Sequence, residues 1–132
     1  KRLRAFVQSL LLRIFDTGPI ARHGRLMSRE MIEPTPALDS LVEERIRPMS
    51  VQLRKIVAEI LDCPVADERV RWCSLSVVSQ CLFYHHCQPV VSRLFPEQKY
   101  DNAGIAQLAD HVANFSLAAM KHLPEAKTIK SK

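Results

Sequence analysis

Glycine and short β-branched runs are both scarce in this sequence. Only three glycines occur among 132 residues, and no alternating run of Val, Ile or Thr is bounded by Gly or Asn turns. Strands therefore have little support. The hydrophobic content of 47% is enough to fill one core, whereas two domains cut from so short a chain would each be too small. We expect one all-α domain.

Long apolar runs are also missing. No stretch approaches the roughly 18 consecutive apolar residues that a membrane-spanning helix needs. Residues 1–15 imitate a signal peptide, but Gln8 and Arg13 interrupt the apolar run and no small-residue cleavage site follows. We predict an amphipathic helix there, and a soluble, cytoplasmic protein without a membrane partner. Because the chain does not begin with Met, we also expect it to be a piece of something longer.

The middle of the chain lacks an excess of positive charge. The formal net charge is +5, but residues 1–4 and the last dozen residues each contribute +3, so that residues 5–120 carry −1. A domain that grips phosphates through its folded body is expected to have a basic face. This distribution argues against nucleic-acid binding by the folded part.

Apolar residues recur at helical spacing along most of the chain. They predict helices over about 3–14, 20–33, 36–61, 67–86, 90–95 and 102–122, with Thr35 as a cap and a kink or split at Pro48. The helix over 67–86 is uncharged between Trp72 and Tyr84 and apolar on all sides, which indicates that it is central to the domain or to an assembly. The predicted fold is an orthogonal helical bundle of about five to six helices over residues 1–123, followed by a flexible basic tail over 124–132.

Methionine, leucine and aromatic side chains from three predicted helices suggest a pocket with apolar walls and a few polar groups. The alternative, that such residues are simply core, stays open. Gln80 favours the pocket, because a buried amide must find a partner. The candidate pocket residues are Phe6, Leu10, Met27, Met31, Trp72, Ser76, Gln80 and Phe83.

Reactive residue types cluster in the stretch CLFYHHCQP, residues 81–89. Cys81 and His85 are one helical turn apart and form a conceivable metal pair or catalytic dyad, but His86 and Cys87 point elsewhere around the helix. No second Cys or His pair completes a metal site, and nothing in the sequence lowers the Cys81 pKa. We predict reduced thiols, no metal, no cofactor and no catalytic residue, with a small thiol or metal enzyme as the weaker alternative.

The run HGRLMSREMIEPTPALDSLVEERIRPM, followed by SVVSQCLFYHHCQPVV, resembles the C-terminal regulatory domain of TetR-family transcriptional regulators, in particular the CecR-type subgroup. The likeness covers about residues 1–123 and rests on packing and turn residues. It implies an all-helical domain that encloses a pocket for a small, largely apolar effector and dimerises through a four-helix bundle. The second helix is the implied transmitter of the effector signal.

In such proteins, operator DNA is bound by an N-terminal helix-turn-helix that is absent from these 132 residues. The resemblance therefore implies a repressor whose DNA contact lies outside this chain. A stand-alone helical interaction module is the other alternative. The residues implied to face a second copy are Val78, Leu82, Ile105, Leu108, Val112, Phe115 and Ala119.

Overall fold

The computed structural model describes residues 1–16 and 28–124, and every regular element within them is helical. The predicted all-α fold is confirmed. Residues 28–32 are helical, while most of the helix predicted over 20–33 lies outside the described residues, as do residues 125–132 of the predicted tail. The other elements are α1 (Arg2–Ile14), α3 (Ala37–Leu41), the π-helical turn η1 (Val42–Ile46), α4 (Arg47–Leu61), α5 (Glu68–His86), α6 (Gln88–Leu94) and α7 (Asn102–Lys121).

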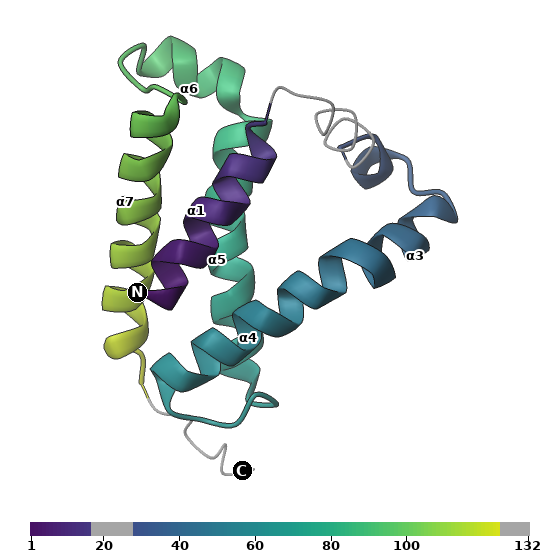
Figure 1. Cartoon of the computed structure of the whole chain (residues 1–132), viewed down its shortest axis with the longest axis vertical. Coiled ribbons are helices and arrows are strands. Elements are labelled where there is room, and N and C mark those ends of the chain that lie inside the picture. The colour runs from purple at the N-terminus through teal and green to yellow at the C-terminus, as the bar shows by residue number, and fades with distance from the viewer. Residues whose placement is uncertain (17–27, 125–132) are drawn as a thin grey trace, which may run out of the picture.

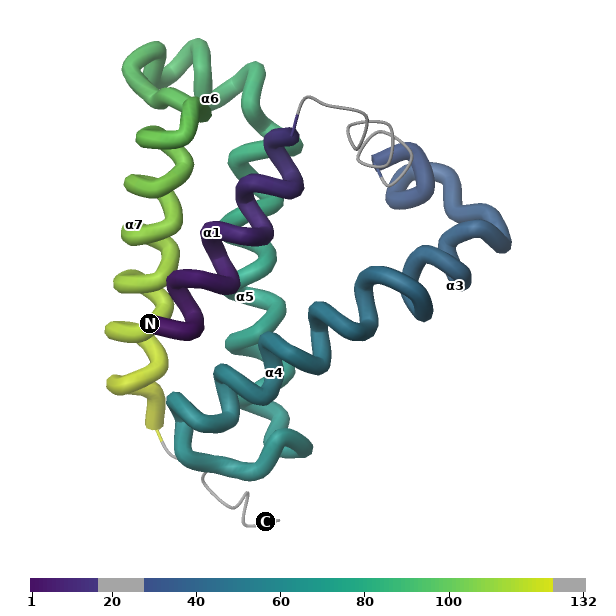
Figure 2. Tube along the Cα trace, viewed as in Figure 1, coloured from purple at the N-terminus to yellow at the C-terminus, as the bar shows by residue number. Residues whose placement is uncertain are grey.

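Among the described residues, α1, α5 and α7 form the body of the molecule, and α4 crosses it. α5 and α7 lie side by side and run in opposite directions, with the short α6 between them at one end (Figure 1). α1 packs against both of them and also against α4. The trace in Figure 2 shows α4 continuing through η1 into α3, which leads away from the body. α6 begins at Gln88, so Pro89 lies in its first turn rather than in a turn before it.

α1 supplies the centre of the core, because three helices cover one of its faces. Leu3, Val7 and Leu11 recur every four residues and are at most 1% exposed. They belong to one buried cluster with residues of α4, α5 and α7. The partners at that centre include Leu53, Val57, Val70, Val77, Cys81, Leu108 and Val112.

The apolar seam of α7 belongs to this same core. Ile105, Leu108 and Val112 are 4%, 5% and 0% exposed, because α7 packs against α1 as well as α5. The prediction that these three residues face a second copy is therefore corrected: helices of their own chain cover them. A seam of alternating three and four indicates that one side of a helix is covered, but it does not tell which chain provides the cover.

Pro48 is accommodated by a change in helix type, not by a break. Pro48 lies in the first turn of α4, directly after η1, and the Arg47 N–H donates to the Val42 carbonyl five residues earlier. A proline removes one helical donor and crowds the preceding turn, and a single π-helical turn is a known way to absorb such a disturbance. The predicted interruption is present, while helical structure continues from residue 37 to residue 61.

Side-chain caps fix where α5 and α7 begin. The Asp67 carboxylate accepts from the Arg69 N–H at 2.9 Å at the start of α5, and Asp101 accepts from the Gly104 N–H at 2.8 Å at the start of α7. Thr35, predicted as a cap, lies one residue before Pro36, the N-cap of α3, and its hydroxyl accepts from the Ala37 N–H at 3.2 Å. These bonds satisfy backbone donors that have no partner within their helices.

Candidate functional site

A hollow of about 390 Å³ lies between α1 and α4. On each helix its lining residues recur three or four positions apart, so that one face of α1 looks at one face of α4. We call it the α1–α4 hollow. Its lining residues are Arg2, Ala5, Phe6, Ser9, Leu10, Arg13, Met49, Gln52, Lys55 and Ile56.

The α1–α4 hollow combines an apolar floor with a cationic edge. Phe6, Leu10 and Ile56 are at least nine-tenths buried and form the floor. Arg2, paired with Glu59, marks one end of the hollow. Arg13 marks the other end, where its guanidinium donates to the Met49 sulfur at 3.3 Å.

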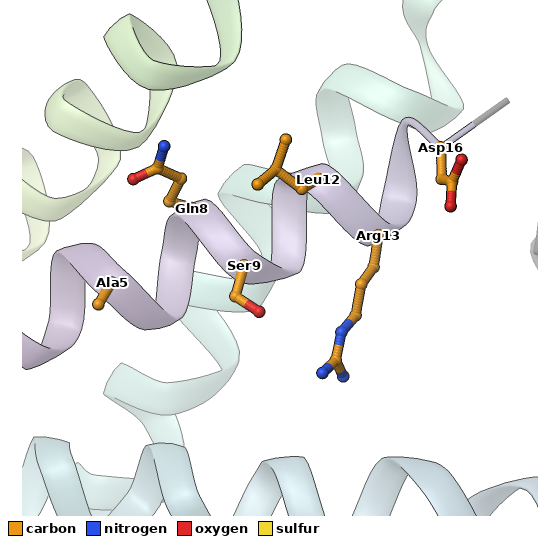
Figure 3. Close-up of a pocket in the computed structure, with 6 residues that line it drawn as sticks. All are labelled: Ala5, Gln8, Ser9, Leu12, Arg13 and Asp16. Carbon is orange, nitrogen blue, oxygen red and sulfur yellow. The ribbon is translucent and has the colours of Figure 1, made fainter. Parts of the chain in front are cut away.

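A shallower hollow lies beside it on α1 and shares Ala5, Ser9 and Arg13 with it. Figure 3 shows Arg13 extending from α1 toward the neighbouring helix, while Gln8 and Leu12 point to the other side. Asp16 lines this second hollow but not the α1–α4 hollow. Arg13 therefore stands at the border between the two.

A third hollow, of about 900 Å³ and larger than the other two, lies along α5 and α7. The Gln80 side-chain amide donates to the Ser116 hydroxyl at 2.9 Å across it, so the polar group that the sequence left in an apolar stretch has its partner on α7. We call this hollow the α5–α7 groove. Its lining residues are Asp67, Glu68, Arg69, Trp72, Cys73, Ser76, Val77, Gln80, Phe115, Ser116, Ala119, Met120, Leu123 and Pro124.

Large apolar side chains are exposed along the same two helices. Trp72, Leu75 and Phe83 of α5 are 55%, 60% and 55% exposed, and Phe115 of α7 is 60% exposed. On α5 these positions fall within one outward-facing stripe, opposite the buried Val70, Val77 and Cys81. We call Trp72, Leu75, Phe83 and Phe115 the apolar stripe.

The structure divides the predicted pocket residues between two surfaces. Phe6 and Leu10 line the α1–α4 hollow, whereas Trp72, Ser76 and Gln80 line the α5–α7 groove. Met31 is 53% exposed and Phe83 belongs to the apolar stripe; neither lines these two hollows. Met27 lies outside the described residues.

The predicted dimer residues are divided as well. Phe115 and Ala119 are exposed and line the α5–α7 groove, and Val78 and Leu82 are half-buried on α5, while the three seam residues of α7 are core. The sequence does not reveal that Trp72, Leu75 and Phe83 are exposed together on one side of α5. The available signal was the uncharged stretch of α5, but apolar residues on all sides of a helix do not tell which side the other helices of the same chain leave exposed.

Cys81 and His85 are poorly placed for catalysis. Cys81 is fully buried, and burial raises the pKa of its thiol to about 12. His85 packs edge-on against the Phe15 ring with centroids 5.6 Å apart, and burial, followed by the nearby His86, lowers its pKa. A thiol is activated by a lowered pKa, so the environment of Cys81 works in the opposite direction.

Metal ligands do not gather in the part of the chain that the structure describes. No group of three or more His, Cys, Asp or Glu side chains within residues 1–16 and 28–124 is arranged to hold an ion. The four cysteines are free. Among the described helices, none combines the length and apolar character needed to cross a bilayer.

Comparison with known proteins identifies the family. A family model described as the C-terminal domain of the HTH-type transcriptional dual regulator CecR matches residues 1–120. No curated protein matches the chain. The matched span includes both helices of the α1–α4 hollow and nearly all of α7, and it agrees with the motifs in residues 23–49 and 76–91. The chain therefore belongs to the family of CecR-type C-terminal domains of TetR-type transcriptional regulators.

Proposed function

We propose that this regulatory domain binds a small effector in the α1–α4 hollow and pairs with a second copy through the apolar stripe. The family match to residues 1–120 carries the proposal, and the two surfaces support its two parts. In this proposal the full-length regulator is a cytoplasmic repressor, and a helix-turn-helix domain outside this chain binds the operator DNA. The chain itself performs no catalysis.

The apolar stripe supports pairing because it is large, exposed and free of charge. Each of its four residues is more than half exposed, and large apolar side chains that gather on the surface of a soluble protein mark interaction sites. A two-fold axis next to α5 and α7 brings the same pair of helices from each copy together, which makes a four-helix bundle. The stripe replaces the buried α7 seam as the predicted dimer face.

Sedimentation velocity over a concentration series tests the pairing. We expect the 132-residue chain to be a dimer at tens of micromolar, and Phe83→Glu or Phe115→Glu to make it monomeric, because each variant buries two symmetry-related charges. Leu94→Glu on α6 is the matched control, since Leu94 is 65% exposed and lies outside the stripe. A clean monomer, or equal dissociation by Leu94→Glu, contradicts the proposed interface.

The α1–α4 hollow supports effector binding because its floor is apolar and its edge is polar, as in most small-molecule sites. Both of its helices also pack against α5 and α7. An effector that fits one arrangement of the dimer better shifts the population toward it, with a coupling that is typically about 1–3 kcal/mol. The helix predicted over 20–33 remains the proposed transmitter to the DNA-binding domain.

The two rival functions predict different results. A stand-alone interaction module predicts a monomer that leaves the apolar stripe open to another protein, and the sedimentation series distinguishes this case. A thiol or metal enzyme predicts that Cys81→Ala abolishes a measurable activity or releases zinc. The burial of Cys81 and its raised pKa favour the regulatory function.

A further inference from the structure

We infer that the ligand of the α1–α4 hollow is an organic carboxylate whose apolar body lies on the floor and whose charged head lies beside Arg13. This inference rests on the proposed function of the hollow as the effector site, and it replaces the expectation of a largely apolar effector. It follows from the charges at the edge, the hydrogen bonding of Arg13 and the size of the hollow.

The charges that line the hollow are of one sign. Among the described residues, Arg2, Arg13 and Lys55 line it and no acidic residue does. Arg2 already has a partner in Glu59, which lies outside the lining. Within the part of the chain that the structure describes, neither Arg13 nor Lys55 forms an ion pair. A surface that leaves two cations unneutralised around an apolar floor attracts an anion.

Of the two arginines that line the hollow, Arg13 has the weaker present partner. Its guanidinium donates to the Met49 thioether at 3.3 Å, and a thioether sulfur is a weak acceptor. A carboxylate in that position accepts two parallel, charge-assisted hydrogen bonds from the same guanidinium. Because Arg2 and Glu59 occupy the opposite end, the head of the ligand is assigned to the Arg13 end.

The floor and the volume limit the rest of the ligand. Phe6, Leu10 and Ile56 offer only apolar contact, while Ser9 and Gln52 supply polar atoms at the sides. A volume of about 390 Å³ lies near the lower end of the range for small-molecule sites. It is large enough for a bicyclic aromatic acid or a medium-chain fatty acid.

Isothermal titration calorimetry with 2-naphthoate and 2-naphthamide tests the inference, because the two probes share one ring system and differ in charge. We expect the 132-residue chain to bind naphthoate about tenfold more tightly than naphthamide, as a charge-assisted hydrogen bond predicts. Arg13→Gln is expected to reduce that preference to about twofold or less without changing the affinity for naphthamide.

Two control variants separate this inference from the function on which it rests. Arg54→Gln removes a cation from α4 whose guanidinium donates to the Ser50 carbonyl and which does not line the hollow; the naphthoate preference is expected to survive. Ser9→Trp fills the hollow from an exposed position and is expected to abolish binding of both probes.

Each remaining outcome counts against one of the two claims. Equal affinity for both probes, or equal loss from Arg13→Gln and Arg54→Gln, overturns the carboxylate inference and leaves the hollow as an apolar site. Binding that persists in Ser9→Trp, or no binding of either probe to the parent chain, overturns the proposed effector site itself.

Discussion

Cys81 carries a reactive group in surroundings that suppress its reactivity. It is fully buried in the core, and removal from water raises the pKa of its thiol to about 12, because burial disfavours the charged thiolate. The thiolate is the nucleophilic form. Cys87, six residues later at the end of α5, is partly exposed. The two thiols of the stretch 81–89 are therefore chemically different.

Alkylation of the native protein is expected to reflect this difference. With iodoacetamide at neutral pH, Cys87 is expected to react while Cys81 stays unmodified, because Cys81 is neither exposed nor ionised. Mass spectrometry of tryptic peptides measures both rates, and a sample in urea supplies the unfolded reference, in which the two should react alike. Equal alkylation rates of Cys81 and Cys87 in the native protein would contradict the burial of Cys81. Such a result would favour the alternative that the protein is a thiol enzyme.

At the scale of elements, the start of α7 depends on one carboxylate and one glycine. Asp101 satisfies the Gly104 N–H. A side chain at Gly104 would collide with the Lys99 carbonyl, so the chain entering α7 passes very close to its first turn. This entry positions Ile105 and Leu108 for burial against α1.

Removal of the Asp101 cap is expected to weaken the fold measurably. Asp101→Ala should lower the free energy of unfolding by about 0.5–2 kcal/mol, because a backbone donor loses its partner. Asp101→Asn is the matched variant, since its side-chain oxygen can still accept, and it should retain most of the stability. Urea unfolding followed by circular dichroism measures both. An equal loss in the two variants would mean that charge, and not the cap, matters.

The sequence was sufficient to predict the helices but not to assign their sides. Apolar spacing located α1, α5 and α7 within a few residues, because the burial of one side of a helix leaves a direct periodic trace. For α5, apolar spacing locates the helix but does not tell which of its sides is buried. An apolar side that other helices of the chain cover and an apolar side that is exposed have the same pattern in the sequence. Trp72 and Val77 are both apolar, yet Trp72 is 55% exposed and Val77 is 1% exposed.

The candidate site was predictable only in part, for a related reason. Phe6 and Leu10 were recognised, but their partners across the hollow were not. Met49 and Ile56 continue the apolar pattern of α4, which is equally typical of core residues, while Lys55 and Arg13 resemble ordinary solvated charges. Which helix faces which is a property of the packing, and single-helix periodicity does not contain it.

At the scale of the whole molecule, His85 connects the end of α5 to two other segments. Its ring packs against Phe15, which follows α1, and Phe15 stacks on Tyr100 of the loop before α7 with centroids 4.7 Å apart. Burial, and then the neighbouring His86, lowers the pKa of His85 below its ordinary value of 6.5. The folded protein therefore binds a proton at His85 less readily than the unfolded chain does.

Global stability should consequently depend on pH near the acidic side of neutrality. The sign follows from linkage: the unfolded state binds more protons, so stability rises with pH. The urea midpoint is expected to fall as the pH drops from about 7 to about 5, through the unfolded value of His85. The urea midpoint of the His85→Gln variant should fall less over this pH range. The midpoint of the control variant His111→Gln, whose changed residue is exposed, should fall as much as that of the parent protein. If His85→Gln and the parent gave parallel curves, this residue would not be the source.

The π-helical turn Val42–Ile46 rotates α3 relative to α4 about the axis of the helix that they form together. Such a turn holds one residue more than an α-helical turn, and each residue rotates a helix by about 100°. The apolar residues Leu38, Leu41 and Val42 are thus out of phase with Leu53 and Ile56, although their spacing in the sequence suggests one continuous line. In agreement, α4 buries four residues, whereas α3 and η1 bury none. Deletion of one residue from the turn would rotate α3 by about a quarter of a revolution and present a different side of it to its surroundings, without altering any residue of the core.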